Sequence, residues 1–146
     1  EDTYVCTELN KVGVVSKKEW KDMLKFKLKL VWTHPYELWS YITRGKKFVD
    51  KLNSKGINWK KPKYKKMFFT DTLKLESNGN HAKALKLYGK NLIKLDKEFN
   101  INTKLSDKMF NTSFFDRAKA RIKLILNPKN FVFIYSYLKL KVTNNG

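Results

Sequence analysis

The clearest structural pattern in this chain lies in residues 81–99, HAKALKLYGKNLIKLDKEF. Large apolar side chains recur there at intervals of three and four residues, at Leu85, Tyr88, Leu92, Leu95 and Phe99. This spacing places them all on one side of an α-helix, where they can pack against a neighbouring element. The segment before it, Ser77-Asn78-Gly79-Asn80, is typical of a turn. We therefore predict a helix over residues 81–99 that follows a turn and buries one face.

Two further helices are predicted on the N-terminal side of this turn. Ser16 is suited to cap a helix, and Glu19 stands three residues later, where its carboxylate can reach back to the Ser16 backbone. This pattern predicts a helix over about residues 17–32. Pro35 suits the first position of the next helix, because its missing N–H needs no partner there, and that helix is expected to reach Leu52.

A last helix is predicted to end at Asn127-Pro128, because helical geometry is disfavoured for a residue that precedes proline. Its inward side chains are expected to be Phe114, Phe115, Ala118, Ile122 and Ile125. Its outward side chains are expected to be Arg117, Lys119, Arg121 and Lys123.

Three segments carry patterns that suit a strand as well as a helix, namely residues 24–30, 68–75 and 130–142. Residues 24–30 alternate apolar side chains with lysine, as a half-buried strand would, although the cap before them favours a helix. Residues 130–142 are apolar on every side, which suits either a buried helix or a central strand. The predicted fold is mostly α, with helical hairpins packed as a small bundle and minor strand content in these segments at most.

The composition bounds the class of protein. The 146 residues include 32 Lys and Arg against 13 Asp and Glu, a formal net charge of +19, and 42% hydrophobic residues are enough for one globular core. No apolar run exceeds residues 131–135, so no membrane-spanning segment is predicted. With one cysteine, Cys6, and two histidines, the chain supports neither a disulfide scaffold nor a four-ligand zinc site. We predict a single basic helical domain spanning the whole chain, with an acidic N-terminal extension over residues 1–12 and with no cofactor or metal.

The highest density of positive charge lies in a lysine-rich connector that we assign to residues 54–66. From Lys51 to Lys66 the sequence has seven lysines and no acidic residue, a density that self-repels unless a polyanion binds it. Trp59 and Tyr64 lie among these lysines, and rings beside ammonium groups are the combination that binds single-stranded nucleic acid. The alternative is that Trp59 anchors the connector to the core while only the lysines face solvent.

A candidate nucleic-acid interface follows from these patterns. In the connector it consists of Trp59, Lys60, Lys61, Lys63, Tyr64, Lys65 and Lys66. Further phosphate contacts are predicted at Arg117, Arg121 and Lys123, the arginines because a guanidinium can bind phosphate through two hydrogen bonds.

No catalytic residue is assigned. The sequence has no glycine-rich phosphate loop, no serine nucleophile elbow and no carboxylate cluster with metal-ligand spacing. His34 and His81 could act as general acid and base in metal-free RNA cleavage if the fold brought them together. Histidines at such places beside helix starts are usually capping or exposed groups, and we prefer that interpretation.

Two resemblances accompany these patterns. Residues 78–99 resemble the second half of a tetratricopeptide or pentatricopeptide repeat, through Gly79-Asn80-His81, Ala84-Leu85, Leu87-Tyr88 and Leu95-Asp96. This resemblance implies a helical hairpin with a small residue where the paired helices touch. The chain is also similar to the PHIST helical domain of exported malaria-parasite proteins, through Glu8-Leu9-Asn10, Val15-Ser16-Lys17-Lys18, Leu38-Trp39 and Trp59. That similarity implies a helical bundle that binds other proteins.

The sequence thus predicts a non-catalytic basic module that binds a polyanion, with RNA favoured, as a component of a ribonucleoprotein assembly such as an organellar ribosome. The alternative is a protein adaptor that grips an acidic segment of a partner, and the third hypothesis is the ribonuclease that would use His34 and His81. The single cysteine suits a reducing compartment, either the cytoplasm or an organelle matrix. The second resemblance implies an exported parasite protein instead.

Overall fold

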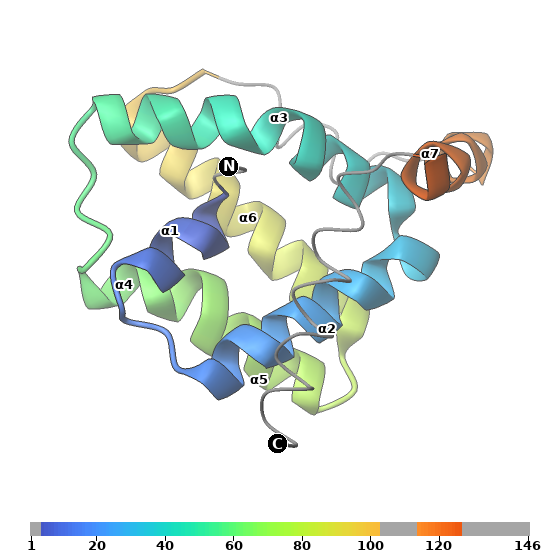
Figure 1. Cartoon of the computed structure of the whole chain (residues 1–146), viewed down its shortest axis with the longest axis horizontal. Helices are drawn as coiled ribbons and strands as arrows, with labels where there is room; N and C mark the ends of the chain where they lie inside the picture. Colours follow the sequence, from blue (N-terminus) through green and yellow to red (C-terminus); the bar gives the residue numbers. More distant parts are fainter. Residues whose placement is uncertain (1–3, 103–113, 127–146) are drawn as a thin grey trace.

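The computed structural model describes residues 4–102 and 114–126, and within these ranges the chain forms helices and no strand (Figure 1). The prediction of a mostly α fold is confirmed. Residues 24–30 lie inside one helix, and residues 68–75 belong to a continuous helical segment. The third segment considered for a strand, 130–142, lies outside the described residues.

The helices form two hairpins around a short central helix (Figure 1). The first hairpin consists of α2 (Lys17–Thr33) and α3 (Pro35–Ser54), and the second of α5 (Asp71–Ser77) and α6 (His81–Phe99). Helix α1 (Val5–Lys11) lies between them, with α6 behind it in the view of Figure 1. This arrangement is the predicted small bundle of helical hairpins.

The described part of the N-terminal segment belongs to the core, so for residues 4–12 the prediction of an acidic extension over residues 1–12 is wrong. One side of α1 and the residue before it are buried, at Tyr4, Val5, Cys6 and Leu9. The Tyr4 ring lies against α3 at Gly45, where a methyl group would come within 2.5 Å of Tyr4 Cδ1. The acidic residues dominate the charge of this short segment, but its few apolar residues share a helical face and pack.

The start of α2 follows the predicted cap. The Glu19 backbone N–H donates to Ser16 Oγ over 3.1 Å, and the Ser16 N–H donates to Glu19 Oε1 over 3.0 Å. These two bonds satisfy backbone donors that a helix start leaves without partners, and they fix the helix to begin at Lys17. Helix α3 begins at Pro35, as predicted.

The second half of the connector is helical. Helix α4 (Pro62–Lys65), the π-helical turn η1 (Lys66–Thr70) and α5 follow one another without a break. A π-helical turn interrupts the regular ladder of backbone hydrogen bonds, so its carbonyl groups can accept other donors. Asn91 of α6 is 3% exposed, and its Nδ2 donates to the Met67 carbonyl oxygen over 2.7 Å. This hydrogen bond links the π-helical turn at the end of the connector to α6.

Helix α7 (Phe114–Leu126) ends where the sequence predicts, and its described outward cations Lys119, Arg121 and Lys123 are exposed as predicted, but side chains predicted to be inward are exposed too. Phe115 and Ile122, predicted to be inward, are 76% and 60% exposed, and Ala118 is exposed as well. Arg121 instead turns toward α2, where its Nη2 donates to the Trp32 carbonyl oxygen over 2.8 Å. The amphipathic pattern therefore does not by itself show which side chains of α7 are buried.

A lysine is part of the core. Lys27 is 4% exposed, and its Nζ lies 4.4 Å from the centre of the Tyr41 ring and 5.8 Å from that of Tyr88. The Tyr88 hydroxyl lies 2.9 Å from the Tyr41 hydroxyl and 3.0 Å from Cys6 Sγ. Burial lowers the pKa of Lys27 and raises the pKa of both tyrosines well above the usual value, because it disfavours every charged form.

Candidate nucleic-acid interface

The two aromatic rings of the connector are buried. Trp59 is 5% exposed and Tyr64 is 1% exposed, and their ring centres lie 6.0 Å apart in an edge-to-face arrangement. The Trp59 Nε1–H donates to Asn53 Oδ1 over 2.7 Å, which satisfies its polar group inside the fold. Neither ring offers an open face to a nucleobase. The anchoring interpretation therefore describes both residues, and the stacking role predicted for them is wrong.

The connector lysines are partly neutralised by acids from other elements. Lys65 lies 3.2 Å from Glu19 of α2, Lys66 lies 3.0 Å from Asp71 of α5, and Lys63 pairs with Glu98 of α6. The hydrogen bond to Glu98 raises the pKa of Lys63. Lys60 and Lys61 are exposed and form no ion pair with a described residue. Of the five predicted phosphate-binding lysines here, two thus have no described acidic partner, and a phosphate would have to displace a carboxylate from the other three.

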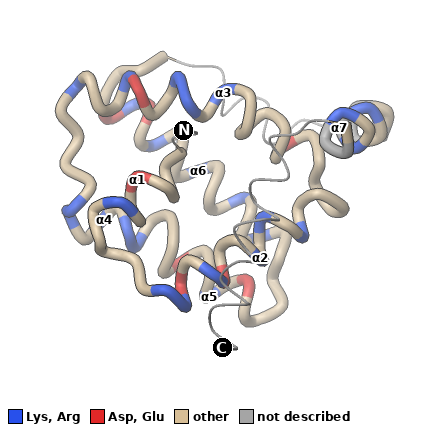
Figure 2. The backbone as a smooth tube through the Cα atoms, viewed as in Figure 1, with Lys and Arg blue, Asp and Glu red and all other residues tan. Residues whose placement is uncertain are grey.

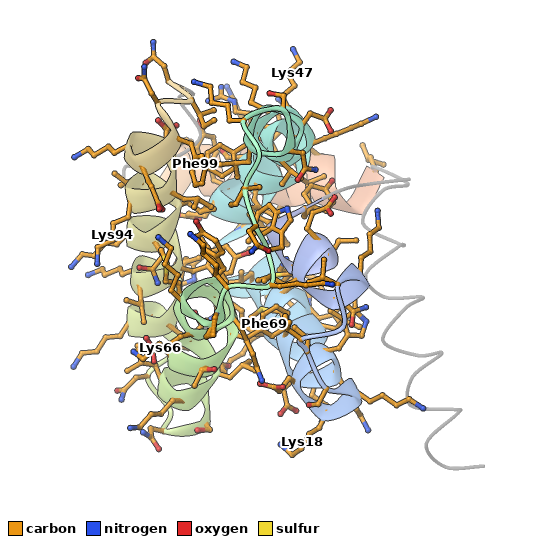
Figure 3. All side chains as sticks on the ribbon, turned by 90° about the vertical axis from the view of Figure 1, so that its left-hand side faces the viewer. Lys18, Lys47, Lys66, Phe69, Lys94 and Phe99 are labelled. Carbon is orange, nitrogen blue, oxygen red and sulfur yellow. The ribbon has the colours of Figure 1, made fainter. Side chains whose placement is uncertain are left out.

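A more continuous basic surface lies on α6. Its outward side carries five exposed lysines at intervals of three, four, four and three residues, namely Lys83, Lys86, Lys90, Lys94 and Lys97. We call this set the α6 lysine row. It extends over about 21 Å at the rise of an α-helix. Figure 3 shows Lys94 pointing away from the bundle, whereas Phe69 and Phe99 lie in its interior.

The positive charge of the α6 lysine row is not neutralised by ion pairs, because the acidic residues of α6 have other partners. None of its lysines forms an ion pair with an acidic side chain in the described part of the chain. The two acids of α6 lie near its end, where Asp96 accepts the Asn102 backbone N–H over 3.0 Å and Glu98 pairs with Lys63. Figure 2 shows other acidic positions where α2 and α5 meet. The row was missed in the sequence, although its spacing is as regular as that of the apolar residues on the same helix.

The predicted contacts of α7 lie on another part of the surface. Arg121 lies beside Trp32, and Lys123 Nζ lies 4.6 Å from the centre of the Trp39 ring. Both cations are exposed. The side chain of Arg117 lies outside the described ones, so its predicted role stays a prediction.

The fold brings the two histidines together. The ring centres of His34 and His81 lie 5.7 Å apart. His81 Nδ1 lies 2.7 Å from Glu76 Oε2, and its Nε2 lies 2.7 Å from Thr33 Oγ1. Both histidines are half-buried rather than exposed, and His81 links the ends of α2 and α5 to the start of α6. Because both of its ring nitrogens have protein partners, this geometry favours a structural link, and the ribonuclease hypothesis stays a prediction.

A groove of about 380 Å³ lies between α2 and α5. Its walls carry charges of both signs, including the pairs Lys18–Asp22 at 2.8 Å and Lys29–Glu76 at 3.5 Å.

Among the helices that the structure describes, none combines the length and apolar character needed to cross a membrane. In residues 4–102 and 114–126, no three His, Cys, Asp or Glu side chains gather in a way that could hold a metal ion.

A scan against protein-family models, a search of curated proteins and a search of solved structures found no match to this chain. The repeat-like and PHIST-like resemblances therefore stay predictions, and the surfaces described above are the basis for an assignment of function.

Proposed function

We propose that this protein is a non-catalytic module that binds the phosphate backbone of RNA through the α6 lysine row. The observation that carries the proposal is a line of five exposed lysines, none of which pairs with a described acidic side chain. Each ammonium group that meets a phosphate releases condensed counterions, and this release supplies much of the affinity of basic proteins for nucleic acids. A row about 21 Å long can contact several phosphates of one strand.

The character of this surface favours a phosphate backbone over an acidic protein. Protein interfaces have an apolar core and are depleted in lysine. The large apolar side chains that are exposed in the described part of the chain lie in α2 and α7, at Trp32, Phe115, Ile122 and Leu126, and none lies on α6. A phosphate backbone needs no apolar contact, because each lysine binds it as a point charge.

Contacts of this kind hold RNA without selecting its sequence, because phosphates are the same at every base. A module that works in this way depends on other components to bring the correct RNA. We therefore place it in a ribonucleoprotein assembly, such as an organellar ribosome.

The test replaces the five lysines of the α6 lysine row with glutamine. A matched control replaces five other exposed lysines, which are Lys11, Lys17, Lys46, Lys47 and Lys51. Both variants lose the same charge, so they separate the row from the net charge of the protein. Fluorescence anisotropy with a labelled RNA at low salt should show a loss of about 100-fold or more for the row variant and less than about 5-fold for the control.

The adaptor hypothesis is tested in the same assay with polyglutamate as a competitor. RNA whose phosphates lie along the α6 lysine row should resist displacement by polyglutamate at an equal concentration of negative charge. Displacement of the RNA by polyglutamate, or an equal loss of affinity in both variants, would contradict the proposal and indicate general attraction to acidic polymers.

A further inference from the structure

Trp32 is exposed near the end of α2, and a cation from α7 is held beside it. The Trp32 side chain and backbone together are 63% exposed. Arg121 Cζ lies 6.0 Å from the centre of the indole ring, and Arg121 Nη2 donates to the Trp32 carbonyl oxygen over 2.8 Å. Because the hydrogen bond to the backbone fixes the guanidinium next to the ring, the two side chains form one unit that presents a π face and a positive charge.

The same pairing of tryptophan and cation recurs at the start of α3. Lys123 Nζ lies 4.6 Å from the centre of the Trp39 ring, and the rings of Trp39 and Tyr36 lie 5.8 Å apart. Trp39 and Tyr36 are half-buried, whereas Trp32 is open to solvent.

Lysines lead to Trp32 along α2, and three of them line the groove between α2 and α5. Four lysines and Trp32 follow one another at intervals of three, four, four and three residues, namely Lys18, Lys21, Lys25, Lys29 and Trp32. This is the same helical spacing as in the α6 lysine row. The side chains of Lys18 and Lys29 are 85% and 55% exposed although each pairs with an acid. Exposed ion pairs of this kind are weak, so a phosphate can replace the carboxylate.

We infer that Trp32 and Arg121 form a stacking site for an unpaired base of single-stranded RNA, with phosphates of the same strand along the lysines of α2. A base offers its π face to the indole ring, and an adjacent phosphate offers an anion to the guanidinium, so one nucleotide satisfies both groups. Stacking tolerates every base, because all four have such a face. An apolar protein surface would cover the ring but offer no anion to Arg121.

This site uses residues of α2 and α7, whereas the α6 lysine row uses residues of α6, and the two share the class of ligand. Figure 1 shows α2 toward the viewer and α6 behind α1. The quarter turn of Figure 3 shows α6 at one edge of the bundle, and α2 meets α6 near its start, where Thr33 Oγ1 lies 2.7 Å from His81 Nε2. The two surfaces therefore predict two separable contributions, base stacking at Trp32 and backbone binding at α6.

The experiment compares an unstructured RNA of about 12 nucleotides with an abasic strand of the same length. The wild-type protein is expected to bind the RNA about 5- to 150-fold more tightly, which is the contribution of one stacked base. Trp32→Leu keeps an apolar side chain but removes the ring, so it should lose this preference, and Trp32→Phe should keep part of it. All three proteins should bind the abasic strand equally, because that strand measures backbone contacts alone.

The melting temperatures of the wild-type protein and the Trp32 variants are measured to separate a loss of stacking from a loss of stability. Because the ring is exposed, Trp32→Leu should melt at the wild-type temperature, and a lower value would show that the ring is structural and overturn the stacking site. Equal affinity of the wild-type protein for the RNA and the abasic strand would overturn it too, as would a preference that persists in Trp32→Leu. Binding of the abasic strand that depends on the α6 lysine row would still support the proposed function in each of these cases.

Discussion

The connector and α6 use the same kinds of residue in opposite ways. Both are rich in lysine and contain large aromatic side chains. In the connector, three lysines pair with acids from α2, α5 and α6, and both rings are buried. In α6, the aromatic and aliphatic side chains face the core, while the α6 lysine row faces solvent without described acidic partners.

The difference shows that charge density along the chain is a poor guide to charge on the surface. A segment without acids can still be neutralised by acids that the fold brings to it, as Glu19, Asp71 and Glu98 are brought to the connector. A helix instead separates its charged side from its apolar side by geometry alone. Lysines with helical spacing on a helix that also has an apolar face are therefore the better predictor of an open basic surface.

The largest effect is expected for Trp59, because its ring is buried in the core. Trp59→Ala removes a side chain that is 5% exposed and its hydrogen bond to Asn53, so it should lower the free energy of unfolding by about 3–5 kcal/mol. Trp32→Ala should change it by less than about 0.5 kcal/mol, since that ring is largely in solvent. Urea denaturation of both variants measures the difference. Equal stability losses would break the distinction between the two tryptophans.

A smaller effect, dependent on pH, is expected for the buried lysine. Because burial lowers the pKa of Lys27, the unfolded chain holds this proton up to about pH 10.5 while the folded protein has already released it. Between the two pKa values stability therefore increases with pH, by at most about 1.4 kcal/mol per pH unit. Above pH 10 stability should decrease, because Tyr41 and Tyr88 keep their protons in the fold and lose them when unfolded.

Lys27→Met should abolish the increase of stability with pH, and Lys94→Met in the α6 lysine row should leave it unchanged. Urea denaturation of the wild-type protein and both variants at several values between pH 7 and pH 10 measures this, the upper limit being the usual tyrosine pKa. A wild-type profile in Lys27→Met would mean that burial of Lys27 does not govern this pH dependence.

The smallest effect is expected for the ion pairs of the connector. Replacement of Lys63, Lys65 and Lys66 with glutamine removes three exposed or half-exposed pairs, each of which contributes about 0–1 kcal/mol. Thermal melting should therefore shift by a few degrees at most. A larger shift would show that these pairs contribute more to stability than exposed ion pairs usually do.

The fold followed from local patterns wherever a helix had both a cap and an apolar face. The capping residues Ser16 and Glu19, the proline at position 35 and the apolar side of residues 81–99 all lie where their spacing predicts. Helix α1 was missed because its seven residues are too short for a periodic pattern to stand out against its charge. Helix α7 was found, but its orientation depends on tertiary contacts that no local pattern contains.

The candidate site was harder to predict because exposure is a tertiary property. Trp59 and Trp32 each lie near lysines in the sequence, and only the fold buries the first and exposes the second. The proximity of His34 to His81 likewise depends on how α2 and α3 meet α6. The α6 lysine row, in contrast, could have been predicted. The helix and its buried side were both correctly assigned, and these lysines occupy the opposite, exposed side.

The dependence of RNA affinity on salt tests the central claim most directly. The comparison uses two variants of equal charge, one with the α6 lysine row replaced by glutamine and one with Lys60, Lys61, Lys63, Lys65 and Lys66 replaced. A plot of log K against log salt for a single-stranded RNA should become shallower by about 3.5 units in the row variant, since each phosphate contact contributes about 0.7. The connector variant should lose less than the row variant, because three of its five lysines already have acidic partners. A wild-type slope in the row variant, with a flattened slope in the connector variant, would contradict the account and place the RNA on the connector.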